Sequence, residues 1–101
     1  MKERKKKDMI KTVEVEYVGI EDVQELMNDV LALISDGHYA SIELQVISGR
    51  PCVSVYILLG GFDINREYDH SFSFYMGDNP EDVKTMNECK STFNNLLTVE
   101  E

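Results

Sequence analysis

Apolar residues recur at two different spacings along this chain, and the order of those spacings constrains the fold more than any other feature. They occupy alternate positions, the period of a half-buried strand, in residues 12–18, 39–47, 52–59 and 68–76. They recur every three or four positions, the period of an amphipathic helix, in residues 21–35 and 83–97. The predicted order is therefore β-α-β-β-β-α.

Turn and cap residues stand where these segments meet. Gly19 ends the first strand, and Gly37 follows the last periodic residue of the first helix, as a C′ glycine does. The sequence Ser-Gly-Arg-Pro at residues 48–51 is turn chemistry, which indicates a hairpin. Asn79 is a good N-cap and Pro80 fits the first helical position of the second helix.

The order of the segments predicts an α+β domain. Three consecutive strands form an antiparallel meander, and both helices pack on one face of it while the other face stays in contact with water. The residues expected on the helix-covered face are Ile42, Leu44, Val46, Val53, Val55, Ile57, Phe72 and Phe74. The sheet has three or four strands, because the sequence leaves the position of residues 12–18 open.

The charge is distributed very unevenly. Residues 1–11 hold six basic and two acidic side chains, a net charge of +4, and we expect them to form a disordered tail. Met9 is an alternative start. Residues 12–101 form the single folded domain and hold four basic and seventeen acidic side chains, a net charge of −13. A domain with this much negative charge repels nucleic-acid phosphates and attracts basic protein surfaces.

The sequence also indicates in which cellular compartment to expect the protein. No apolar run approaches the ~20 residues that cross a bilayer, and no apolar region follows the basic start as in a secretory signal. We therefore expect a cytoplasmic protein that does not bind membranes. Two cysteines, Cys52 and Cys89, are too few for a disulfide-stapled secreted domain and are expected to be reduced.

The sequence offers no recognisable catalytic site. His38, His70, Cys52 and Cys89 are isolated, whereas metal sites use closely spaced ligands, so we expect no metal and no cofactor. A thiol enzyme would need a base near Cys52, and either His70 or His38 could in principle supply it. The glycine pair at residues 60–61 leads into a strand and not a helix, so it is read as a connection and not a phosphate loop.

Two surfaces are candidates for binding another protein. Tyr39, Glu43, Tyr56 and Tyr75 are expected on the water-facing side of the sheet, where tyrosines bury large areas at low entropic cost. The carboxylates at positions 21, 25 and 29 follow one face of the first helix. These are Glu21, Glu25 and Asp29.

The sequence thus predicts a small acidic protein-interaction module without catalytic activity. In size, charge and element order it resembles some phage-encoded inhibitors, including certain anti-CRISPR proteins. That resemblance implies an inhibitor that mimics nucleic acid by offering carboxylates to a basic nucleic-acid-binding protein. The alternatives are a homo-oligomeric structural or accessory domain that uses its outer sheet face or an edge strand, and a small enzyme that uses Cys52 and His70. Direct nucleic-acid binding through the tail is disfavoured by the acidic body.

Overall fold

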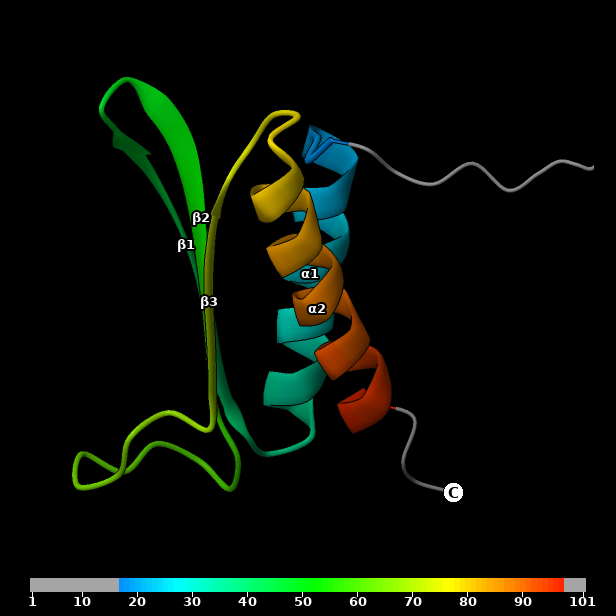
Figure 1. Ribbon diagram of the computed structural model, residues 1–101. Helices are drawn as coiled ribbons and strands as arrows, with labels where there is room; N and C mark the ends of the chain where they lie inside the picture. The colour runs from blue at the N-terminus through cyan, green and yellow to red at the C-terminus, as the bar shows by residue number, and fades with distance from the viewer. Residues whose placement is uncertain (1–16, 98–101) are drawn as a thin grey trace, which may run out of the picture.

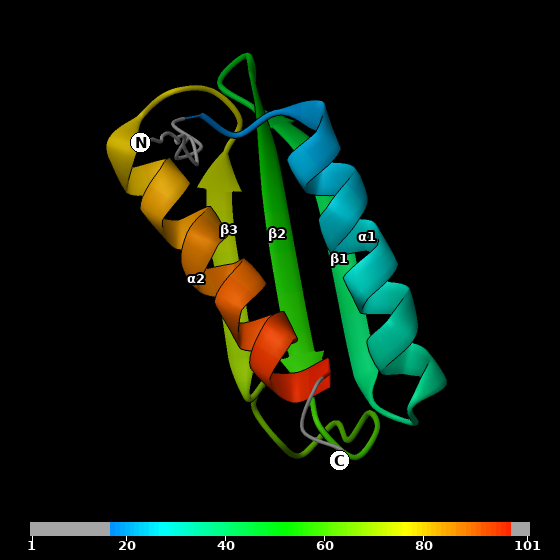
Figure 2. The same cartoon turned by 90° about the vertical axis from the view of Figure 1, so that its right-hand side faces the viewer.

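The computed structural model describes residues 17–97 as a helix layer packed on one face of a sheet (Figure 1). The elements follow the order α-β-β-β-α, which confirms the α+β class and the antiparallel meander. Their bounds are Ile20–Ser35 for α1, Tyr39–Ile47 for β1, Arg50–Leu58 for β2, His70–Tyr75 for β3 and Pro80–Leu97 for α2. The two helices begin at the same end of the molecule, with α1 over β1 and α2 over β3 (Figure 2).

The leading strand expected over residues 12–18 lies mostly outside the described residues. Its last residue, Val18, is buried and forms an isolated antiparallel bridge with Gly77, just beyond β3. The Val18 amide donates to the Gly77 carbonyl at 2.6 Å, and the Gly77 amide donates back to Val18 at 3.1 Å. The described sheet therefore has three strands, in the order β1-β2-β3.

Local signals set the ends of both helices. At the end of α1, Gly37 takes a φ of 94°, its amide donates to Ile34, and the His38 amide donates to Leu33. This is the Schellman arrangement that a C′ glycine permits. At the start of α2, the Asn79 side chain accepts the Glu81 amide at 2.9 Å, as an N-cap does.

The core lies between the sheet and the helices. Val53, Val55, Ile57 and Phe74 are fully or almost fully buried, as the strand alternation predicts. From the helices, the buried contributors are Val23, Leu26, Val30, Leu33, Met86, Cys89 and Phe93. Burial of this apolar surface is the main stabilising term for a domain of this size.

The β1–β2 hairpin extends past this core. Its tip curves away from the helix layer (Figure 1), and Leu44 and Val46 on its helix side are 62% and 74% exposed. The face assignment of these two residues is correct, because they pair with Val53 and Pro51 across the ladder. Their burial does not follow, since no described helix covers the end of the hairpin.

Candidate protein-interaction surface

One side of α1 exposes aliphatic residues along its whole length. Ile20, Met27, Leu31 and Ile34 are 43% to 66% exposed, although the helix buries a separate set against the sheet. On a helical wheel these four lie on the side opposite Asp22 and Glu25, which face α2 through Lys90. The exposed side therefore overhangs β1, the strand beneath α1 (Figure 2).

The exposed hairpin residues continue this side of α1 onto the sheet. We call the combined set the edge surface. Its members are Ile20, Met27, Leu31, Ile34, Leu44 and Val46. Soluble proteins rarely leave contiguous apolar patches of this kind without a partner.

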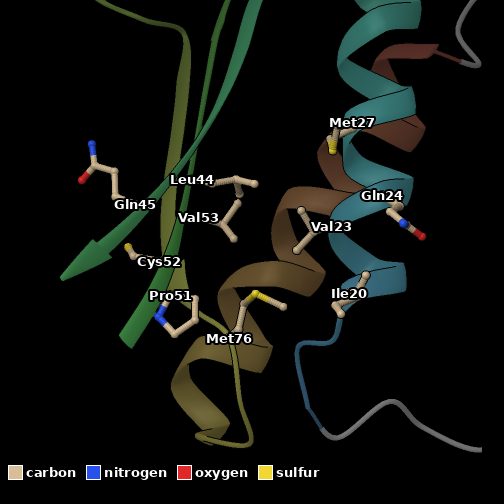
Figure 3. A pocket seen from close by; sticks show the side chains of 10 residues that line it. All are labelled: Ile20, Val23, Gln24, Met27, Leu44, Gln45, Pro51, Cys52, Val53 and Met76. Carbon is tan, nitrogen blue, oxygen red and sulfur yellow. The ribbon is translucent and has the colours of Figure 1, made fainter. Parts of the chain in front are cut away.

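An open groove of about 290 Å³ runs between the two parts of the edge surface. Figure 3 shows Leu44 and Val53 reaching from the sheet toward Val23 and Met27 of α1. The groove's two glutamines, Gln24 and Gln45, project away from it (Figure 3). No Asp, Glu, Lys, Arg or His side chain lines the groove, so it suits apolar side chains.

The acidic stripe of α1 does not form a single free face. Glu25 pairs with Lys90 of α2 at 3.1 Å, and Asp22 pairs with the same ammonium at 2.6 Å. Asp29 is half-buried beside α2, and its pKa is raised by burial first and by Glu25 second. Glu21 alone of the three predicted residues is exposed away from this contact. The structure therefore brings Glu25 and Asp29 together at the α1–α2 contact and leaves Glu21 apart.

The loop of residues 59–69 covers one end of the outer sheet face. Tyr39 packs on Phe62 and Tyr68 at ring-centroid distances of 5.3 and 6.1 Å, and Tyr56 packs on Tyr68 at 4.9 Å. Leu58, which directly precedes this loop and lies opposite Tyr39, is almost completely buried, although the strand alternation places it on the outer face. Tyr68 also lies on this outer face, because β3 begins two residues later than the alternation predicts.

Hydrogen bonds hold the loop of residues 59–69 in place. Asp69 accepts the Leu59 amide at 2.7 Å, and Arg66 donates both to the Leu59 carbonyl and to Asp69. His38 accepts the Gly60 amide through Nδ1 at 2.8 Å, so this histidine has a structural partner. Tyr39 and Tyr56 are consequently half-buried within the chain itself.

The other two predicted residues of the outer face lie apart from this aromatic cluster. Tyr75 is half-buried at the opposite end of the sheet, where the Arg50 guanidinium stacks 4.4 Å from its ring centroid. Glu43 is exposed in the middle of β1, opposite Ser54. The structure thus pairs Tyr39 with Tyr56 and separates both from Tyr75.

The groups proposed for thiol chemistry lie far from each other. Cys52 lies opposite Tyr75 and His70 lies opposite Ile57, so the two are five positions apart along the ladder. Their side chains also point to opposite faces of the sheet. Burial, followed by the charge of Asp29, raises the pKa of the Cys89 thiol to about 12. Within residues 17–97, no three His, Cys, Asp or Glu side chains stand close enough to hold a metal ion.

Sequence reasoning missed the edge surface as a site, although a signal was present. The apolar arc of the first helix, from Val23 through Leu26 and Met27 to Leu31, is wider than the stripe that one sheet contact buries. The outer part of that arc becomes the exposed side of α1. The periodicity that predicts the helix therefore also shows an apolar arc wider than one sheet contact requires.

Comparison of the chain with models of protein families, with curated protein sequences and with solved structures gives no match. Neither helix among the described residues combines the length and the hydropathy needed to cross a bilayer.

Proposed function

We propose that this protein is a small, non-catalytic interaction module that binds another protein chain through the edge surface. The observation that carries the proposal is the set of six aliphatic side chains, each at least 43% exposed, along α1 and the helix side of β1. A specific interface needs an apolar centre with a polar rim. The edge surface offers that centre, and Gln24, Gln45 and Glu43 supply polar atoms at its margins.

The test compares partner capture by three versions of the full chain at low and at high salt. Leu31→Glu places a charge on the edge surface at a residue that is 61% exposed, so the new carboxylate stays in contact with water in the free chain. Ile64→Glu is the matched control, because Ile64 is 82% exposed but lies in the loop of residues 59–69. We expect capture to survive high salt, to be lost with Leu31→Glu and to persist with Ile64→Glu. Equal capture by all three chains would contradict the proposal.

A second candidate, an inhibitor that mimics nucleic acid, is favoured by the charge arrangement. Three of the four basic residues in the described range, Arg50, Arg66 and Lys90, form ion pairs within the domain. Exposed carboxylates such as Glu21, Glu43 and Glu81 therefore dominate the surface that a basic partner would meet.

Salt dependence separates the two candidates. A complex that depends on carboxylates weakens steeply as ionic strength rises, because the charges are screened. We expect the mimic to lose its basic partner at high salt and to bind the Leu31→Glu variant as well as the natural chain. Retention of that partner at high salt would exclude this second candidate.

A further inference from the structure

We propose that the partner of the edge surface is a second copy of this chain. The two copies join antiparallel through β1, so that two three-stranded sheets become one sheet of six strands and the two α1 helices face each other on the same side. This inference rests on the proposed function, because it names the occupant of the same surface.

The β1 edge of the sheet lacks the protection that exposed sheet edges usually carry. β1 is nine residues long and stands at the end of the sheet order β1-β2-β3, with no described strand beyond it. Soluble proteins protect such edges with lysines, prolines, bulges or covering elements. β1 contains no lysine and no proline, pairs with β2 without interruption, and carries Glu43 as its one charge.

The hairpin geometry shows which backbone groups face that edge. Ser48 and Gly49 form a two-residue turn with φ values of 53° and 76°, so Ile47 and Arg50 close the ladder as a hydrogen-bonded pair. Odd-numbered residues of β1 then bond to β2. The odd residues of β2 bond to the β3 side, as Pro51 does when it accepts the Met76 amide. The amides and carbonyls of Ile42, Leu44 and Val46 therefore point outward from the sheet.

The register centred on Leu44 is one that brings these outward groups together. If Leu44 lies opposite Leu44 of the second copy, the outward amides and carbonyls meet, and Ile42 lies opposite Val46. Glu43 then faces Gln45 of the second copy, which can donate a hydrogen bond to it. A shift that sets Glu43 opposite its own copy would place like charges directly across the pair, which is unfavourable.

The same register also covers the exposed aliphatic residues. Leu44 and Val46 lie on the helix side of the sheet, and the exposed side of α1 overhangs the edge that the second copy would occupy. Val46 of the second copy would then pack beside Met27 and Leu31 of the first copy. A stable interface buries roughly 800 Å² on each partner. Six large aliphatic residues, 43% to 74% exposed, together with nine residues of strand edge supply much of that area.

Two other occupants fit the described residues less well. A charged partner finds little to bind, because the groove has no charged lining residue. The chain's own N-terminal segment joins the described residues at Tyr17 and Val18, and Val18 bridges Gly77 beside β3, at the edge of the sheet farthest from β1. A second copy supplies both a matching strand and a matching apolar helix.

The first experiment measures the mass of the full chain by sedimentation equilibrium over a range of concentrations. We expect a species of twice 11.6 kDa for the natural chain and for Ile64→Glu, and a species of 11.6 kDa for Leu31→Glu. Circular dichroism verifies that all three chains are folded. A natural chain that stays at 11.6 kDa throughout, or a dimer that Leu31→Glu leaves intact, overturns the inference.

The second experiment tests the register with one introduced cysteine at a time, beside the buried Cys52 and Cys89. In the proposed register the two Cα atoms at position 44 lie about 5.5 Å apart, a separation that a disulfide spans. We therefore expect Leu44→Cys to give a covalent dimer under mild oxidation. Val46→Cys is the matched control, because two such residues would lie about 13 Å apart along the strands and stay unlinked. Linkage at position 46 without linkage at position 44 overturns the register.

Failure of this inference is distinguishable from failure of the proposed function. A monomeric natural chain that captures a different protein, and loses it on Leu31→Glu, leaves the function intact and removes the second copy as occupant. A monomeric chain whose captured proteins are unaffected by Leu31→Glu removes both.

Discussion

Lys90 of α2 forms salt bridges to two carboxylates of α1 and so links the two helices. Its ammonium, on a side chain 23% exposed, contacts the carboxylates of Asp22 and Glu25 on α1, and Asp22 also accepts the Gly19 amide at 2.9 Å. Burial lowers the pKa of Lys90, but the hydrogen bonds to Asp22 and Glu25 outweigh burial and raise the pKa overall. The stabilisation that the charged Lys90 gives to the fold is therefore fully present at pH values below the ordinary lysine pKa of 10.5. It is lost as the pH rises through the higher pKa that Lys90 has in the folded state.

Asp29 is the residue of this cluster that destabilises the fold at neutral pH. Burial and the charge of Glu25 raise its pKa, and Lys90 offsets them only in part. We predict that Asp29→Asn increases the free energy of unfolding at pH 7 by a few tenths of a kcal/mol, measured by urea denaturation. The gain should vanish below pH 3.8, where the carboxyl is neutral in both states.

The control for this prediction is Glu88→Gln, an exposed carboxylate on α2. It removes the same charge without relieving a half-buried site, so its effect should be smaller than that of Asp29→Asn. An Asp29→Asn chain that is less stable than the natural one at pH 7 would show that the carboxylate is a favourable partner of Lys90.

Hydrogen bonds to adjacent peptide groups were predictable from sequence. Hydrogen bonds to residues that are distant along the chain were not. Asn79 and Gly37 behave as predicted because a cap depends on a few adjacent peptide groups. Asp82 stands at the third helical position, where a capping-box carboxylate bonds back to the N-cap residue. In the fold it accepts the Tyr75 amide at 3.1 Å. That partner belongs to β3, and only the packed fold brings it within reach.

At the scale of elements, the loop of residues 59–69 packs its aromatic residues on one end of the outer sheet face. Asp69 has a lowered pKa, chiefly because it accepts the Leu59 amide, with Arg66 adding to the effect against some burial. The contribution of Asp69 is thus present above its ordinary value of 3.8 and is lost as the pH falls through the lower folded value. Acid should therefore loosen the loop before it unfolds the core.

Removal of this carboxylate should loosen the loop at neutral pH. We predict that Asp69→Asn speeds tryptic cleavage after Arg66 several-fold, because Arg66 loses its carboxylate partner and the loop opens more often. Mass spectrometry of timed digests measures the rate. Asp78→Asn, an exposed acid outside the loop, is the control and should leave the rate unchanged. Equal cleavage in the natural chain and Asp69→Asn would mean that the aromatic contacts alone fix the loop.

The β1–β2 hairpin shows that periodicity predicts the face on which a strand residue lies but not its depth of burial. Alternation over residues 39–47 placed Ile42, Leu44 and Val46 on the helix side, and the ladder agrees. Alternation cannot give depth of burial, which depends on what covers the strand. A helix of 16 residues and a nine-residue strand have comparable lengths, but the hairpin tip bends away from α1 and leaves Leu44 and Val46 exposed.

For the molecule as a whole, charge and exposed apolar surface occupy different places. The ion pairs Lys90–Asp22 and Arg50–Asp82 lie at the inner flank of α1 and near the start of α2, whereas the edge surface holds no charged member. The net charge of −9 keeps molecules apart at long range, while the edge surface favours a contact that excludes water. Association through this surface should consequently strengthen as salt screens the repulsion.

Amide hydrogen exchange of β1, followed residue by residue as a function of protein concentration, measures whether the β1 edge pairs with a second copy in solution. The amides of Glu43 and Gln45 point toward β2 and should be protected at every concentration, which makes them an internal reference. The amides of Ile42 and Leu44 point outward, and we predict that their protection rises with concentration as the second copy binds. Exchange at Leu44 that stays fast at every concentration, beside a protected Glu43, would contradict the account, because the β1 edge would then be free.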